Sequence, residues 1–222
     1  MDRKESAVRG CLLGLAVGDA MGYPVDKKSW TEICEDYGPN GLLGYDLVNG
    51  TADITSYTQL AAFACNGLLL GTTRRKPEQI SKFLALSLRE WARSQQFRGG
   101  TERTFCWLAQ VPQMRRRHCM DTRILDALAR EQLGTPERPI FRSDTPAMLP
   151  AAVAVGLMYD PEQLPPSQVG LLAAETVAFT HGEPESFLSG AVLAYAVAGI
   201  LQEPEKPLIA QFLAAVQAVQ DQ

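Results

Sequence analysis

The sequence RGCLLGLAVGDAMGYPVD, residues 9–26, places four glycines four residues apart: Gly10, Gly14, Gly18 and Gly22. Because residues at i and i+4 share one face of an α-helix, this spacing predicts a glycine-lined helical face. Glycine destabilises a helix interior by about 1 kcal/mol relative to alanine, so such a face needs a compensating reason. Two compatible reasons are open. Either a neighbouring helix backbone packs closely here, or the helix ends beside a ligand that approaches its backbone.

Helical periodicity continues along most of the chain. Apolar residues recur at helical spacing in residues 4–21, 56–71, 77–97, 102–113, 119–133, 146–159, 166–180, 185–201 and 206–221. Pro77, Ser167 and Pro207 lie near predicted helix starts, where a missing N–H or a capping hydroxyl is favourable. No segment sustains the alternation of a strand. The sequence therefore predicts an all-α fold of about nine or ten helices.

Composition is typical of a globular protein with one core. The chain has 222 residues, of which 46% are hydrophobic and 21% charged. We expect residues 1–222 to form a single domain. The net charge is −4, so neither nucleic acid nor an anionic membrane is an expected partner. One basic run, residues 115–118, is interpreted as a solvated helix end.

Cysteine usage and the N-terminus indicate a soluble, cytoplasmic protein. The five cysteines are odd in number and form no C-x-x-C pair, which favours reduced thiols over disulfides or a zinc site. The charged N-terminus has no signal-peptide pattern. The apolar stretches at residues 12–17 and 188–201 fall short of the roughly 18–20 residues of a membrane span.

Functional side chains are expected in the predicted loops, because loops usually carry sites on a rigid scaffold. The candidate loops are residues 22–30, 38–55, 134–146 and 180–184. Residues 134–146 form the longest irregular stretch, and loops of that length are often functional.

Four segments resemble, in order, motifs of the ADP-ribosylglycohydrolase family. Residues 9–26 are similar to its opening R-G-x-L-x-G-x-A-x-G-D-A-x-G-x-P-x-E, and residues 54–61, ITSYTQLA, resemble its T-D-D-T-Q helix start. Residues 148–159 resemble the helix that follows an N-G-x-x-M-R segment, and residues 180–184, THGEP, resemble a T-H-x-x-P turn. The resemblance implies a compact, orthogonal multi-helix fold.

Members of that family hydrolyse the glycosidic bond of ADP-ribose with two magnesium ions held by carboxylates. The resemblance therefore implies ADP-ribose or a related nucleotide as the ligand. It also implies a set of candidate ligand-binding positions: Asp19, Asp26, Thr55, Ser56, Tyr57, Asp144 and His181.

The sequence departs from the family pattern at the carboxylates. Ser56 and Tyr57 stand where the family has paired aspartates, and the family's later D-x-D-T motif is absent from these 222 residues. Asp26 replaces a glutamate, and Asp144 replaces an asparagine. Magnesium prefers anionic oxygen ligands, whereas Ser and Tyr are neutral at pH 7. We therefore expect a degenerate metal site at Asp26, Thr55, Ser56 and Tyr57, no cofactor, and a catalytically inactive protein.

Several roles remain open at the candidate positions. Asp19 either orients the loop that carries Asp26 or contacts the ligand directly. Ser56 and Tyr57 either begin a helix, with Thr55 or Ser56 as its N-cap, or Tyr57 fills the emptied metal cavity. His181 either caps backbone carbonyls in its turn or acts as a base or ligand contact.

The alternative function is an active ADP-ribosyl hydrolase, with magnesium or with metal-independent chemistry. Two carboxylates suffice for metal-free glycoside hydrolysis. Asp26 would be the catalytic residue, paired with Asp53 or Asp144.

The missing D-x-D-T segment has a second consequence. Without the family's last helices, apolar surface should be uncovered, with the helix at 206–221 covering part of it. Large exposed apolar patches usually become interfaces. We therefore expect a homo-oligomer or a stable protein partner, unless the sequence is a fragment whose missing end carries the motif.

Overall fold

The computed structural model describes residues 3–47, 49–96, 104–117, 121–158, 160 and 166–221. Over these residues the chain is helical and contains no strand, so the all-α prediction is confirmed. The α-helices are α1 (Arg3–Gly22), α2 (Trp30–Tyr37), α3 (Ser56–Thr73), α4 (Ile80–Gln96), α5 (Thr122–Ala129), α6 (Leu149–Leu157), α7 (Pro166–Ala178), α8 (Pro184–Gln202) and α9 (Leu208–Gln220). Short 3-10 turns are η1 (Tyr23–Val25), η2 (Pro77–Gln79), η3 (Trp107–Gln110), η4 (Pro112–Arg115) and η5 (Pro146–Met148).

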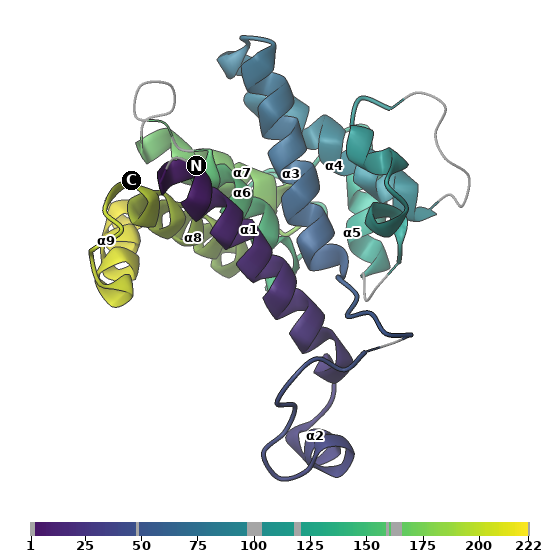
Figure 1. Cartoon of the computed structure of the whole chain (residues 1–222). Coiled ribbons are helices and arrows are strands. Elements are labelled where there is room, and N and C mark those ends of the chain that lie inside the picture. The colour runs from purple at the N-terminus through teal and green to yellow at the C-terminus, as the bar shows by residue number, and fades with distance from the viewer. Residues whose placement is uncertain are drawn as a thin grey trace.

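The body of the molecule consists of α3 to α9. Helix α3 packs on α4 and α6, and α8 packs on α6, α7 and α9 (Figure 1). The core between them is continuous and includes the fully buried side chains of Leu60, Trp91, Leu128 and Met148. Burial of apolar area on this scale is the main stabilising contribution to the fold.

Glycines in the body permit very close helix contacts. A Cβ atom at Gly156 of α6 would lie 2.6 Å from the carbonyl oxygen of Ala194 on α8. A Cβ atom at Gly67 of α3 would lie 2.8 Å from the Cα of Leu84 on α4. At these two positions only glycine fits without a shift of a neighbouring backbone.

Helix α1 is attached far more loosely. Ala20 is its one buried residue among those described, and Leu13 and Val17 are exposed. The four glycines of its glycine-lined face are called the ridge below. Nothing lies within 4 Å of a Cβ atom built on any of these glycines. Close packing against a neighbouring backbone is therefore the wrong reason for Gly10, Gly14, Gly18 and Gly22.

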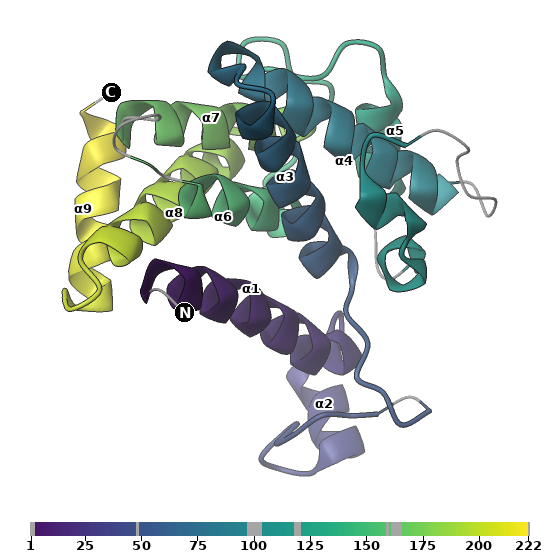
Figure 2. The same cartoon turned by 45° about the horizontal axis from the view of Figure 1, so that its top comes forward.

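Residues 23–47 and 49–53 form an arm that projects from the end of α1 (Figure 2). The arm contains α2, a helix that the sequence analysis missed between its predicted segments at 4–21 and 56–71. Helix α2 begins with a capping box, in which Ser29 accepts the N–H of Glu32 and the Glu32 carboxylate accepts the N–H of Ser29. It contains no buried residue, so its cap rather than its packing defines it.

Two predicted helices need correction. The helix expected at 102–113 is instead the pair of 3-10 turns η3 and η4, because Pro112 cannot donate the hydrogen bond that would continue a helix. The helix expected at 119–133 is shortened to α5, which begins after the Asp121 cap. Residues 102, 103, 119 and 120 of these segments lie outside the described ranges.

Helix α8 also differs from its expected length. It begins at Pro184, and by length and composition alone it is long and apolar enough to cross a membrane. The apolar stretch at 188–201 alone is shorter than a membrane span, but the helix begins four residues earlier. The core helix of a soluble protein passes the same test, and α8 packs against α1, α6, α7 and α9.

Candidate functional site

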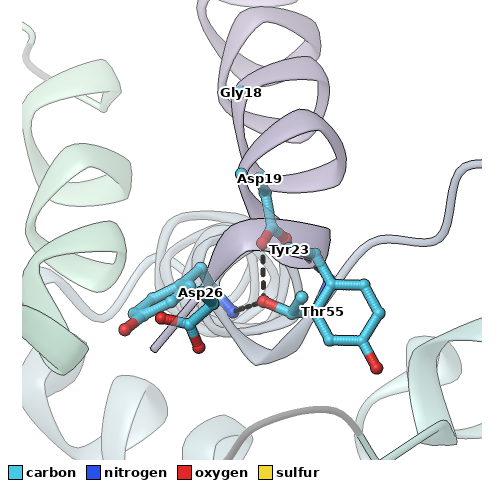
Figure 3. A pocket seen from close by; sticks show the side chains of 7 residues that line it. Gly18, Asp19, Tyr23, Asp26 and Thr55 are labelled. Atoms are coloured by element: carbon cyan, nitrogen blue, oxygen red, sulfur yellow. Dashed lines mark hydrogen bonds between the residues drawn. The ribbon is translucent and has the colours of Figure 1, made fainter. Parts of the chain in front are cut away.

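Asp19, near the end of α1, clamps the beginning of α3. Its carboxylate accepts the backbone N–H groups of Thr55 and Thr58, with N···O distances of 2.7 and 3.1 Å. It also accepts the hydroxyl groups of the same two threonines, each at 2.6 Å. Figure 3 shows the bond from the Thr55 hydroxyl. Hydrogen bonds to a charged acceptor are about twice as strong as neutral ones. Asp19 therefore fixes the first turn of α3.

The Thr55 side chain completes the helix start. It accepts the backbone N–H of Tyr57 at 3.2 Å while it donates to Asp19. Thr55 is thus the N-cap of α3. Of the two residues expected as N-cap, Thr55 and Ser56, the structure confirms Thr55. Ser56 is buried in the first turn and does not line the pocket described next.

A pocket of about 210 Å³ opens at this junction, and it is called the α1–α3 pocket below. Its lining residues are Gly18, Asp19, Gly22, Tyr23, Asp26, Thr55 and Tyr57 (Figure 3). Four of these were expected from sequence, namely Asp19, Asp26, Thr55 and Tyr57. Gly18 and Gly22 line the pocket with exposed backbone, which agrees with the ligand-approach reason for the ridge.

Among the described residues, Asp26 is the one carboxylate of the pocket whose side chain accepts no hydrogen bond. Its side chain is exposed, and the neighbouring Lys28 pairs with Asp36 at 2.8 Å instead. The next residue, Lys27, has a φ of +67°, a left-handed conformation that is unusual outside glycine. This sharp turn begins the arm and leaves Asp26 at the mouth of the pocket.

The residues of the pocket do not fit a pair of magnesium ions. Such ions require several anionic oxygens at one point. Both oxygens of Asp19 accept hydrogen bonds, which leaves Asp26 with the neutral oxygens of Thr55 and Tyr57. Within the described ranges, no three His, Cys, Asp or Glu side chains lie together in a way that would hold a metal ion.

Two candidate residues lie elsewhere. Asp144 is exposed in the 141–145 loop, and His181 is fully buried beside that loop. Neither lines the α1–α3 pocket. Their place in one site with Asp26 is therefore not supported by the geometry.

His181 joins two threonines rather than capping backbone carbonyls. Its Nε2 lies 2.8 Å from the Thr145 hydroxyl, and its Nδ1 lies 2.7 Å from the Thr180 hydroxyl. Burial lowers the pKa of His181, with a smaller opposing influence from Asp121. A neutral imidazole in this position ties the 141–145 loop to the turn between α7 and α8.

The two carboxylates considered as partners of Asp26 do not line the α1–α3 pocket. Asp53 instead accepts both bonds of a salt bridge from Arg116, at 2.6 and 2.7 Å, and Asp144 is exposed in its own loop. The basic run at 115–118 is thus more than a solvated helix end, because its Arg116 forms a salt bridge with Asp53. His118 lies outside the described residues.

A buried network behind this salt bridge was not predicted. Gln59 of α3 donates to the backbone carbonyls of Gln113 and Arg116, and its amide oxygen accepts the indole N–H of Trp91 at 3.0 Å. A glutamine in an apolar helical run is the sequence signal that could have indicated a buried polar network. The network holds the η4 segment against α3 and α4.

The comparisons with known proteins agree with the motifs. The model of the ADP-ribosylglycohydrolase family matches residues 1–222. Neither the search of curated proteins nor the search of solved structures found a match. The match over the whole chain shows that this protein belongs to the ADP-ribosylglycohydrolase family.

Proposed function

We propose that this ADP-ribosylglycohydrolase-like protein is catalytically inactive and binds ADP-ribose, or a related nucleotide, without metal at the α1–α3 pocket. The observation that carries the proposal is that both oxygens of the Asp19 carboxylate accept hydrogen bonds from Thr55 and Thr58. Because Asp19 is occupied by the threonines of α3, Asp26 is the only uncommitted carboxylate of the lining. One carboxylate does not offset the dehydration of two divalent ions.

The lining supports binding of part of a nucleotide. Tyr23 and Tyr57 provide two aromatic side chains, and Gly18 and Gly22 expose backbone at the same opening. A base stacks on an aromatic ring regardless of its identity. A volume of about 210 Å³ accommodates one moiety of ADP-ribose, such as its base or one ribose, and leaves the remainder in solvent.

Isothermal titration calorimetry with ADP-ribose tests binding. We expect a dissociation constant in the millimolar range or tighter, and Tyr57→Ala should weaken it by about 1–3 kcal/mol if a base stacks there. Tyr45→Ala is the matched control, since Tyr45 is exposed on the arm and does not line the pocket. Absence of heat at millimolar ADP-ribose would confine the protein to an interaction role.

An activity assay tests the inactive state. The purified protein is incubated with ADP-ribosylated arginine and serine substrates, with and without magnesium, and release of ADP-ribose is measured. We expect none above the blank. Turnover that disappears in Asp26→Ala would replace our proposal with the second candidate, an active hydrolase with altered chemistry.

Self-association is a further part of the proposal, and α9 supports it. The helix has no charged side chain between residues 208 and 220. Its exposed apolar residues are Leu208, Ile209, Phe212, Leu213 and Val216. An uncharged face suits the same face of a second copy, and a two-fold pairing would close the assembly.

Analytical ultracentrifugation tests the self-association. We expect a concentration-dependent dimer for the native sequence and a monomer for Leu213→Asp, because a charge would be buried in the interface. A monomer at all concentrations of the native protein would contradict this part of the proposal.

A further inference from the structure

A second cavity, of about 380 Å³, lies on α7 and shares no lining residue with the α1–α3 pocket. It is called the α7 cavity below. Its walls are the start of α4, one face of α7 and the turn at residues 134–137, which belongs to the longest irregular stretch of the sequence. Its volume is within the range typical of small-molecule sites, about 300–1,000 Å³.

Part of the lining of the α7 cavity is apolar. Leu171 of α7 and Phe179, just after its end, are eight residues apart, so they lie on one face with Glu175 between them. Leu171 is 56% exposed although it is a large apolar side chain. An apolar surface left open inside a concave site favours a ligand with an apolar body.

The lining of the α7 cavity also contains two exposed carboxylates, Glu175 of α7 and Glu137 of the turn. Among the described residues, neither forms an ion pair, although Lys82 and Arg138 lie nearby in the sequence. The cavity therefore carries uncompensated negative charge beside apolar surface.

The turn that carries Glu137 is fixed in place. Thr135 and Arg138 exchange backbone hydrogen bonds of 3.2 and 3.1 Å, and the Thr135 hydroxyl donates to the Glu137 carboxylate at 2.9 Å. The N–H of Gly134 donates to the carbonyl of Phe179 at 3.0 Å, which attaches the turn to the end of α7. This arrangement pre-organises the rim, and pre-organisation lowers the entropic cost of binding.

We propose that the α7 cavity is a second binding site, specific for a small organic cation with a flat amidinium or guanidinium group and an apolar body. The cationic group would donate to Glu137 and Glu175, as planar cations do to carboxylates. The apolar body would cover Leu171 and Phe179.

Benzamidine and benzamide make a matched pair of probes, because they have nearly the same shape and differ in charge. NMR titration of the full chain should show benzamidine binding at least about tenfold more tightly than benzamide, since hydrogen bonds between charged groups are the stronger ones. Glu175→Gln should remove most of this preference, and Glu137→Gln should reduce it.

The controls separate charge from shape and from the other site. Glu185→Gln makes the same change on an exposed glutamate of α8 outside the cavity, and it should leave binding unchanged. Leu171→Ala should weaken both probes equally. Asp26→Ala, which alters the α1–α3 pocket, should not affect benzamidine. Equal binding of the two probes, or an equal loss in Glu185→Gln, would overturn the proposal.

Discussion

The body of the molecule and the segment formed by α1 and the arm are held by different forces. In the body, α3, α4, α6 and α8 bury many apolar side chains. At Gly67 and Gly156 the neighbouring backbone leaves no room even for a methyl group. In α1 and the arm, residues 3–53, almost every side chain is exposed or half-buried, and a charged clamp at Asp19 makes the junction. The family's most recognisable motif therefore lies in the less packed region.

This difference indicates what the motif does in this chain. Glycines that permit close helix packing lie against a neighbouring backbone, but a Cβ atom built on any of the four glycines of α1 would meet nothing within 4 Å. The motif brings the Asp19 carboxylate into hydrogen bonds with the start of α3. It also places Gly18, Gly22 and Asp26 around one pocket. The motif thus encodes a junction with a pocket rather than a piece of core.

The largest expected effect is in the body. Trp91→Ala removes a fully buried indole and leaves the Gln59 amide oxygen without its donor. We expect the free energy of unfolding to fall by about 3–5 kcal/mol, as for other large-to-small core changes. Urea denaturation followed by circular dichroism measures it. A loss below about 1 kcal/mol would mean that the site collapses around the missing ring.

At the junction, Asp19→Ala should detach α1 from α3. Four hydrogen-bond donors lose a charged acceptor, each such bond contributing about 1.5–3 kcal/mol in isolation, with strong non-additivity. We expect faster amide hydrogen exchange across α1 and at Thr55 and Thr58, while the exchange of Leu88 in α4 stays unchanged. Uniform acceleration throughout the chain would show that the two regions unfold together.

A glycine-to-alanine substitution should lower the free energy of unfolding in the body and raise it in α1. Gly156→Ala brings a methyl group 2.6 Å from the carbonyl of Ala194, and overpacking of this kind costs about 1–3 kcal/mol. Gly14→Ala meets nothing within 4 Å, so the better helix propensity should stabilise α1 by up to about 1 kcal/mol. Differential scanning calorimetry gives both values. Destabilisation by Gly14→Ala would reveal a partner packed on the ridge.

The smallest expected effect is a pH dependence within the body. Burial lowers the pKa of His181, whereas the unfolded chain keeps a value near 6.5. The unfolded state therefore binds more protons than the folded state below pH 6.5, so the free energy of unfolding falls as the pH drops through that value. Urea midpoints between pH 7.5 and 5 should show the decline, and His181→Gln should flatten it.

The long helices of the body could be predicted from sequence because their apolar periodicity reflects burial on one face. Helix α2 could not, since eight residues without a buried side chain leave only the Ser29–Glu32 cap as a signal. At the candidate site, Asp19, Asp26, Thr55 and Tyr57 converge as the motifs imply. Asp144 and His181 do not line that pocket, because tertiary bonds such as Thr145 to His181 fix the path of the 141–145 loop, and motif order does not define such bonds.

The position of α1 in the chain also bears on folding. Asp19 reaches its partners only once Thr55 and Thr58 have been synthesised, and α1 also contacts α8, which begins at Pro184. During translation the first helix therefore emerges well before the surfaces that will hold it. Contacts between residues so distant in sequence form late because of the loop-closure entropy they require. We therefore expect the Asp19 junction and the contact of α1 with α8 to form after the body has folded.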